Sequence, residues 1–188
     1  MEASEASEEQ FQYLTFGVDG EEYAIGILQV REIIGHRTPT TVPMAPDYVA
    51  GVINMRGSVV SVVDLALKFG LPSAEVTKRT CIVIVDVVVG NELTMTGVLV
   101  EGVHAVIDLQ PDEIEPPPGF GTGTAGQYLL GMGNLGERFL PILDIDRVLT
   151  EDGILEGLAR ENGEAKPSEV DHDDSARGGA PDHSAESA

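Results

Sequence analysis

The fold is decided by the stretch YVAGVINMRGSVVSVVDLALKF (residues 48–69), because its pattern returns eighty residues later as YLLGMGNLGERFLPILDIDRVL (128–149). Each copy contains an apolar run, a turn, a second apolar run and an Asp that opens a helical pattern. Between the two copies, four positions are identical, and nine others have a different large aliphatic residue or Phe in each copy. The identical pairs are Tyr48/Tyr128, Gly51/Gly131, Asn54/Asn134 and Asp64/Asp144. This repetition predicts two structural units of similar build.

The rest of the chain between residues 10 and 150 continues the pattern of short strands and turns. The predicted hairpins are Phe11–Gly17 with Glu22–Ile27 around Asp19-Gly20, Gly51–Met55 with Ser58–Val63 around Arg56-Gly57, and Ile82–Val89 with Leu93–Val100 around Gly90-Asn91. The first and third hairpins resemble each other at a shift of 70 to 71 residues. We therefore predict two small five-stranded β-barrels, at about 10–78 and 79–150.

Helices are predicted to be few and short. They are expected at Asp64–Phe69, Asp144–Leu149 and Gly153–Arg160, with Asp64 and Asp144 as N-caps. The N-terminal residues 1–9 and the C-terminal residues 161–188 are acidic and poor in large apolar side chains. Because such segments cannot bury enough apolar surface to offset the entropy of ordering, both ends are predicted to be disordered.

Charge excludes several function classes. The formal net charge is −21, and residues 10–150 alone contain 17 acidic and 8 basic residues. A body of this sign repels phosphates and anionic lipid headgroups, so we expect neither nucleic-acid binding nor direct membrane contact. The chain has no apolar run of membrane-spanning length, no signal-peptide pattern and a single cysteine, Cys81. These features predict a cytoplasmic protein without an intramolecular disulfide.

A search for reactive groups predicts no catalytic residue, no metal site and no cofactor. The four histidines are scattered, and Cys81 lies in an apolar run typical of a buried position. Residues 121–126 fit the pattern G-x-G-x-x-G, but prolines precede them and a strand pattern follows, so a loop is favoured over a dinucleotide site. The segment 171–174, DHDD, is interpreted as a solvated charge run.

Two features remain that could serve a partner. Arg56 lies at a tight turn between apolar strands; it could be a surface residue paired with a carboxylate, or a fixed cation that reaches an acidic partner. The segment Ile25–Ile34 fits a strand, a helical turn or a switch between them. If partly exposed, it would form an apolar docking strip edged by Arg31 and Glu32.

These same residues resemble the chemotaxis coupling-protein (CheW) family. The resemblance is carried by EEYAIGILQVREII (21–34) and VPMAPDYVAGVINMRGSVVSVVDL (42–65), and continues through residues 81–85, 97–103 and 128–136. It implies an all-β fold with a few short helices, in which two SH3-like barrels pack around a shared interface within residues 10–160. It also implies a non-enzymatic adaptor, cytoplasmic and recruited to membrane receptor arrays. Its implied partners are the cytoplasmic tip of methyl-accepting receptors and the regulatory domain of the histidine kinase CheA.

The resemblance assigns roles to individual positions. For the kinase it implies Ile33, Gly35 and Val42. For the receptor it implies Val30, Glu32, Gly51, Asn54, Arg56, Val83, Val85 and Val98. The last three match either groove or barrel-packing positions, and both readings stay open at this point. Met55, Ser61 and Ala66 depart from the family pattern, and the first of these is a volume-conserving exchange.

Two alternatives are also compatible with the sequence. A regulatory module of another two-component pathway would have the same fold. A small-ligand-binding β-barrel would need a deep pocket with convergent polar groups, and no residues to line one are evident.

Overall fold

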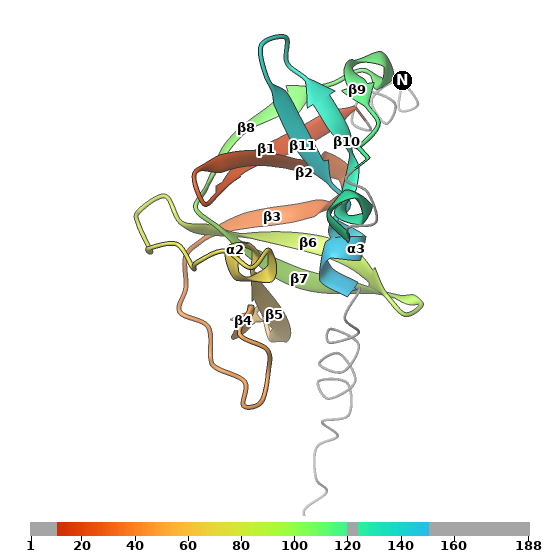
Figure 1. The fold of residues 1–188 in the computed structure, drawn as a ribbon. Coiled ribbons are helices and arrows are strands. Elements are labelled where there is room, and N and C mark those ends of the chain that lie inside the picture. The colour runs from red at the N-terminus through yellow and green to blue at the C-terminus, as the bar shows by residue number, and fades with distance from the viewer. Residues whose placement is uncertain (1–10, 120–123, 151–188) are drawn as a thin grey trace, which may run out of the picture.

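The computed structural model describes residues 11–119 and 124–150, and it consists of two curled β-sheets with short helices (Figure 1). The first barrel is a five-stranded sheet in the order β3-β6-β7-β5-β4, formed by β3 (Val30–Gly35), β4 (Val49–Met55), β5 (Ser58–Asp64), β6 (Cys81–Val89) and β7 (Glu92–Val100). The second barrel is a six-stranded sheet in the order β8-β1-β2-β11-β10-β9, formed by β1 (Gln12–Val18), β2 (Glu21–Gly26), β8 (Gly102–Asp108), β9 (Ile114–Glu115), β10 (Leu129–Asn134) and β11 (Phe139–Leu143). The predicted pair of SH3-like barrels is confirmed, and the second barrel has six strands where five were expected.

The described residues also include five short helical elements, four between strands and one after the last strand. They are the 3₁₀ turns η1 (Ile27–Gln29), η2 (Pro111–Glu113) and η3 (Thr124–Tyr128), and the α-helices α2 (Leu65–Lys68) and α3 (Ile145–Thr150). Within residues 11–119 and 124–150, none of the helices is long and apolar enough to cross a membrane. The predicted helix 153–160, both chain ends and the start of the glycine-rich loop lie outside the described residues.

The two barrels are built by exchanging a hairpin. The N-terminal hairpin β1–β2 belongs to the sheet of β8–β11, whereas β6–β7 belongs to the sheet of β3–β5. In each barrel the exchanged hairpin joins its host through a parallel pairing, β2 with β11 and β7 with β5. The predicted division at about residue 78 is therefore corrected. A repeat in sequence identifies matching strands, but it does not determine the copy with which each strand pairs.

The repeat itself is confirmed in detail. The side chains of Asp64 and Asp144 accept hydrogen bonds from Leu67 N and Arg147 N, each at 3.2 Å, so both are N-caps. The backbone N–H of each Asp also donates to the carbonyl of the tyrosine that begins its copy of the repeat. Asp64 donates to Tyr48 and Asp144 donates to Tyr128, at 2.8 Å in both cases. The two strand–turn–strand–helix units therefore close in the same way.

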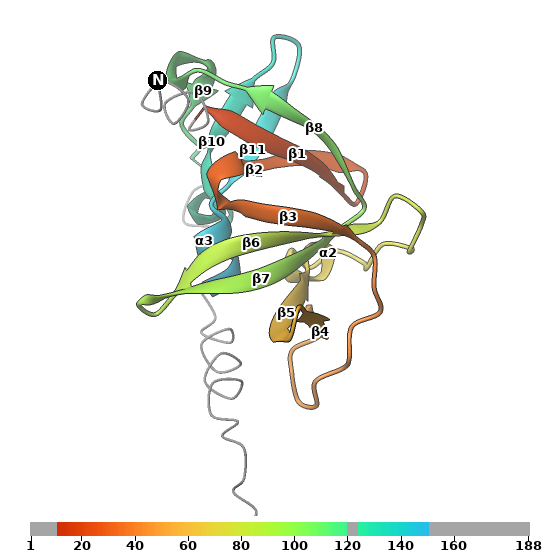
Figure 2. The same ribbon diagram turned by 180° about the vertical axis from the view of Figure 1, so that it is seen from behind.

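The ambiguous segment Ile25–Ile34 is a switch between local structures. It ends β2, forms the turn η1 and then continues as the edge strand β3. Figure 2 shows β3 following β2 through η1, with β6 and β7 beyond it. Strands β8 and β9 were not predicted, because most side chains of β8 are exposed and β9 has only two residues.

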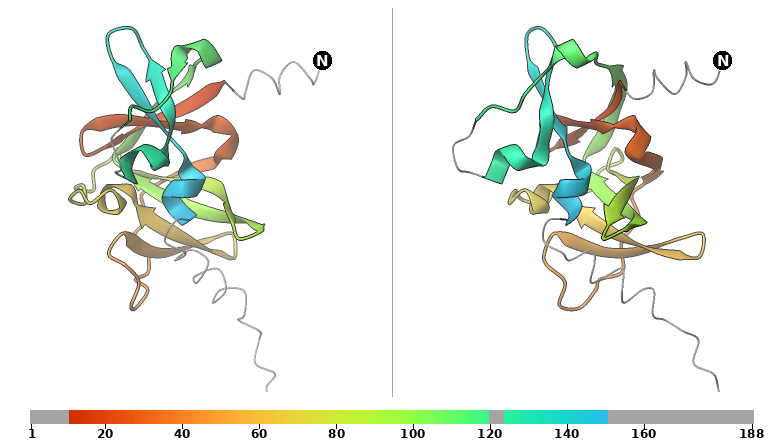
Figure 3. Two further views of the ribbon diagram at one scale, coloured as in Figure 1. Left: turned by 45° about the vertical axis from the view of Figure 1, so that its right-hand side comes forward. Right: turned by 90° about the vertical axis from the view of Figure 1, so that its right-hand side faces the viewer.

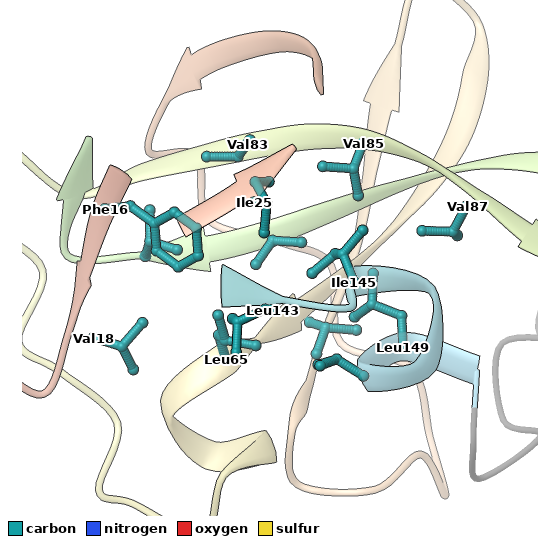
Figure 4. Close-up of a cluster of buried hydrophobic side chains, with 14 of the residues drawn as sticks. Phe16, Val18, Ile25, Leu65, Val83, Val85, Val87, Leu143, Ile145 and Leu149 are labelled. Carbon is teal, nitrogen blue, oxygen red and sulfur yellow. The ribbon is translucent and has the colours of Figure 1, made fainter. Parts of the chain in front are cut away.

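A shared core between the barrels is the largest apolar cluster. Phe16 from the second barrel, Val85 from the first and Leu149 from α3 all contribute to it (Figure 4). Figure 3 shows α3 lying between the two sheets. Since full burial of one such side chain stabilises the fold by about 1.5–3 kcal/mol, this core holds the barrels together as one body.

Each barrel also has a smaller interior of its own. The first contains Ile53, Met55, Val60, Val62, Ile82 and Ile84, and the second contains Ala24, Leu109, Leu140 and Ile142. Strand β6 serves two cores, because alternate side chains of a strand point to opposite faces. Ile82 and Ile84 fill the first barrel, whereas Val83 and Val85 face the shared core.

Candidate protein-interaction surface

The turn between β4 and β5 presents Arg56 at the surface of the first barrel. Arg56 and Gly57 have φ of 52° and 89°, as expected for a two-residue type I′ hairpin turn. The side-chain oxygen of Asn54 accepts a hydrogen bond from Gly57 N at 2.9 Å and so holds the turn. The left-handed conformation costs a non-glycine residue about 1–2 kcal/mol, yet Arg56 occupies it with its side chain 82% exposed.

The exposed guanidinium of Arg56 is held by one carboxylate from β3. Its Nη1 and Nη2 donate to the two oxygens of Glu32, each at 3.2 Å. The Glu32 side chain is only 26% exposed, so the long and exposed Arg56 side chain is anchored on a carboxylate that is largely buried. An exposed pair of this kind adds at most about 1 kcal/mol to stability. Its main structural effect is to orient Arg56 across the edge of the barrel.

A second ion pair lies further along the same edge. The Arg31 Nε and Nη2 atoms donate to the Asp86 carboxylate at 2.9–3.2 Å. The register between β3 and β6 shifts between Val30 and Glu32, so Arg31 lies at a β-bulge. The Asp86 carboxylate raises the pKa of Arg31 above its ordinary value. Bulges redirect side chains. Here two adjacent residues of β3, the cation Arg31 and the anion Glu32, each form an ion pair with a different partner.

The other predicted face of β3 is apolar and open. Ile33 is 45% exposed, and a side chain added at Gly35 would meet no atom within 4 Å. Val42, in the connection between β3 and β4, is partly exposed. Ile33, Gly35 and Val42 therefore have accessible surface, as a protein-binding role requires.

Four of the predicted receptor-binding residues have no such surface. Val83, Val85 and Val98 are at most 1% exposed and belong to the shared core, so their open assignment is corrected to barrel packing. Gly51 is buried with φ of 137°, and a Cβ there would overlap the carbonyl oxygen of Thr40. Its role is to let the connection before β4 approach the strand. Val30 is partly buried against the shared core.

The structure thus brings Glu32, Asn54 and Arg56 together at one edge, whereas Val30 packs partly against the shared core. We call Glu32, Asn54 and Arg56 the Arg56 face, and Ile33, Gly35 and Val42 the Ile33 face. Both faces include residues of β3, whose side chains alternate in direction.

The equivalent turn of the second barrel carries a different set of charges. Asn134 Oδ1 accepts from Gly136 N, two residues further on, at 2.9 Å, whereas Asn54 accepts from Gly57 N, three residues further on. The cation of this turn is Arg138, whose side chain is 61% exposed, and Arg138 and His104 both contact Glu22, at 2.6 and 3.0 Å. Burial raises the pKa of the Glu22 carboxyl, but the hydrogen bonds from His104 and Arg138 outweigh burial and leave that pKa below its ordinary value. Nothing in the sequence indicates that Glu22 contacts His104 and Arg138, which are far from it in the chain.

Among the residues that the structure describes, no group of three or more His, Cys, Asp or Glu side chains is arranged to hold a metal ion. The polar side chains gathered at the Arg56 face form an ion pair and a hydrogen bond that holds the turn.

Comparison with known proteins identifies the family. A sequence model described as the CheW-like domain matches residues 12–153. The chain belongs to the CheW family. A chemotaxis protein CheW from Klebsiella aerogenes is 36% identical over 141 residues, covering 75% of this chain and 82% of the relative. One from Bacillus subtilis is 34% identical over 142 residues, covering 74% and 86%.

A solved CheW structure agrees with the fold. The scaffolding protein TtCheW from Thermoanaerobacter tengcongensis matches with a TM-score of 0.66 at 27% identity, over 75% of this chain and 93% of that one. The predicted resemblance and fold class are therefore confirmed. CheW membership places the chain among the scaffolding proteins of chemotaxis signalling, a family of scaffolds rather than of enzymes.

Proposed function

We propose that this chain is a non-catalytic cytoplasmic adaptor that couples methyl-accepting chemotaxis receptors to the histidine kinase CheA at membrane receptor arrays. The observation that carries the proposal is the match of residues 12–153 to the CheW-like domain, together with two accessible faces that both include residues of β3. An adaptor needs two separate surfaces held in a fixed relation. Strand β3 supplies residues to both.

The Arg56 face is proposed to bind the receptor tip. Arg56 is held out by the turn and oriented by Glu32, and its guanidinium can form paired hydrogen bonds with a carboxylate or with carbonyl groups of a helical hairpin. Because the cation is already in place, little side-chain entropy would be lost on binding.

The Ile33 face is proposed to bind the regulatory domain of CheA. Ile33 offers an exposed β-branched side chain, and Gly35 leaves open space for a partner side chain next to it. Partly exposed apolar residues at a strand edge are typical of protein–protein contacts.

Coupling in this proposal needs no reactive group. The shared core joins both barrels into one rigid body. A partner that binds at one face therefore moves the other face only by small shifts of the whole body. The array then changes kinase output by changing geometry.

The test is co-sedimentation with a receptor-tip fragment and with the kinase regulatory domain. We expect the unmodified chain to bind both. Arg56→Glu should weaken receptor binding by about tenfold or more and leave kinase binding intact, since reversing the charge of a contacting cation costs over 1.4 kcal/mol. Ile33→Asp should do the opposite.

The matched control is Arg138→Glu, which reverses a charge near the equivalent turn of the second barrel. It should leave receptor binding unchanged. Circular dichroism of each variant establishes that the fold is retained. No association of the unmodified chain with either fragment would overturn the proposed function.

A further inference from the structure

The chain passes between the two barrels at only two places within the described residues. The first is η1, which joins β2 to β3, and the second is Glu101, which joins β7 to β8. None of the three residues of η1 is buried, and no side chain caps it at its start. Strand β3, which supplies Glu32 to the Arg56 face and Ile33 and Gly35 to the Ile33 face, follows η1 directly, so contacts made to η1 act on the start of this strand.

The side chain of Asp146 makes such a contact. Its Oδ2 accepts a hydrogen bond from Gln29 Nε2 in η1 at 2.8 Å, and its Oδ1 accepts from Val88 N in β6 at 2.9 Å. One carboxylate in α3 therefore joins the crossing segment to the first barrel. Hydrogen bonds to a charged acceptor are the stronger kind, so this contact is the main polar restraint on η1.

The location of Val88 on β6 explains the need for this contact. The pairing of β3 with β6 ends at Val85, and beyond that residue β3 has turned away into η1. Val88 N is thus on a part of the β6 edge that β3 does not cover, and the Asp146 carboxylate supplies its acceptor. Helix α3 can hold that carboxylate steadily because Ile145, Val148 and Leu149 are buried in the shared core.

The second crossing is held by comparable hydrogen bonds. Glu101 Oε2 accepts from Gly20 N at 3.1 Å, and Glu101 N donates to the carbonyl of Gly17 at 3.0 Å. At both crossings a carboxylate bonds to a backbone N–H of the exchanged hairpin in the barrel that the chain is entering. The recurrence shows that the restraint belongs to the architecture of the exchange.

We propose that Asp146 is a positioning residue for strand β3, through which α3 and the second barrel fix the strand that supplies Glu32 to the Arg56 face and Ile33 and Gly35 to the Ile33 face. This inference rests on the proposed function for its binding readout. Loss of the Asp146 carboxylate frees η1, lets the start of β3 move relative to the shared core and weakens binding at both faces together.

The experiment compares Asp146→Ala with Asp144→Ala. Asp144 caps the same helix and its side chain bonds within α3, so its loss weakens the helix without touching η1 or β6. Exchange of the Val88 amide hydrogen is measured by NMR, and the affinities for the receptor-tip fragment and for the kinase regulatory domain are measured separately.

We expect Asp146→Ala to accelerate Val88 exchange by about tenfold or more and to weaken both affinities by several-fold, as the loss of two charge-assisted hydrogen bonds implies. Asp144→Ala should lower the melting temperature without either effect. Asp146→Asn should largely restore binding, because its oxygen can still accept from Val88 N and the Gln29 amide can turn to accept from its NH₂ group.

Equal effects of Asp144→Ala and Asp146→Ala would overturn the proposal, because they would reduce the role of Asp146 to helix stability. Unchanged Val88 exchange in Asp146→Ala would also overturn it, whatever the binding result. If the unmodified chain binds neither fragment, the proposed function fails, while the exchange comparison still decides the positioning role.

Discussion

The two barrels have the same build and a different surface. Each contains a turn held by an Asn, a strand that leads into an Asp-capped helix, and a hairpin obtained from the other part of the chain. In the first barrel the turn leaves the Arg56 side chain 82% exposed. In the second, Arg138 is bound to Glu22 together with His104. A duplicated scaffold can thus keep its internal contacts while the cations at its two turns differ. Arg56 occupies a left-handed position of its turn, whereas Arg138, 61% exposed, pairs with a carboxylate that His104 also contacts.

The largest expected effect concerns the glycine shared by both repeats. At Gly51, an alanine would meet both a φ of 137° and the Thr40 carbonyl, whereas at Gly131 it would meet Ile114 Cγ2 at 2.6 Å and Glu115 O at 2.9 Å without a positive φ. We expect Gly51→Ala to lower the free energy of unfolding by about 3 kcal/mol or more, and Gly131→Ala by about 1–3 kcal/mol. Urea unfolding measures both; equal losses would show that the barrels are built more alike than their backbones indicate.

The helix caps should differ in the same direction. Asp64 is 5% exposed and accepts from Leu67 N and from the Ser73 hydroxyl, at 2.5 Å for the latter, whereas Asp144 is more exposed. We expect Asp64→Ala to cost about 2 kcal/mol and Asp144→Ala about 1 kcal/mol. Thermal unfolding of the two variants compares them, and a larger loss for Asp144 would contradict this ranking.

A pH-dependent difference is expected at the second barrel. Despite the opposing effect of burial, His104 and Arg138 hold the pKa of Glu22 below its ordinary value, so the folded state binds its proton less readily than the unfolded state does. The resulting stabilisation is present above the unfolded pKa of about 4.3 and is lost as pH falls through the folded pKa. Glu22→Gln should therefore lower the melting temperature at pH 7 but much less at pH 3. A constant difference between the two pH values would exclude this ion cluster as the cause.

The smallest effect is a predicted gain. Thr96 is fully buried, and its hydroxyl has no hydrogen-bond partner among the described residues. Replacement by the equally large Val removes an unsatisfied polar group, so Thr96→Val should raise the free energy of unfolding by about 1 kcal/mol. A loss of stability in Thr96→Val would show that the hydroxyl is solvated or bonded in solution.

The sequence predicted the elements of this fold better than their partners. The repeat between residues 48–69 and 128–149 identified two strand pairs and both caps, because turns and caps are encoded locally. The hairpin exchange was not predictable in this way, since strand pairing depends on contacts between distant parts of the chain. The edge strand β8 was missed because its exposed side chains give no apolar alternation.

The candidate site shows the same limit. Arg56 and Glu32 were both selected from sequence, and their ion pair fits the local pattern of turn and strand. Val83 and Val85 lie in the continuous apolar run of β6, a pattern typical of strands buried on both faces, and that signal favours packing over binding. The bond from Asp146 to Gln29 spans 117 residues, and nothing in the local sequence of either residue indicates it.

The most direct test of the whole account exchanges the two charges of the Arg56 face. The double variant Glu32→Arg/Arg56→Glu can re-form the ion pair with its polarity reversed, so stability should stay close to that of the unmodified chain. Affinity for the receptor-tip fragment is then measured by isothermal titration. If Arg56 contacts the receptor, binding stays at least about tenfold weaker although the fold is intact. Full recovery of binding in the exchanged pair would contradict the account, because it would make Arg56 a structural residue only.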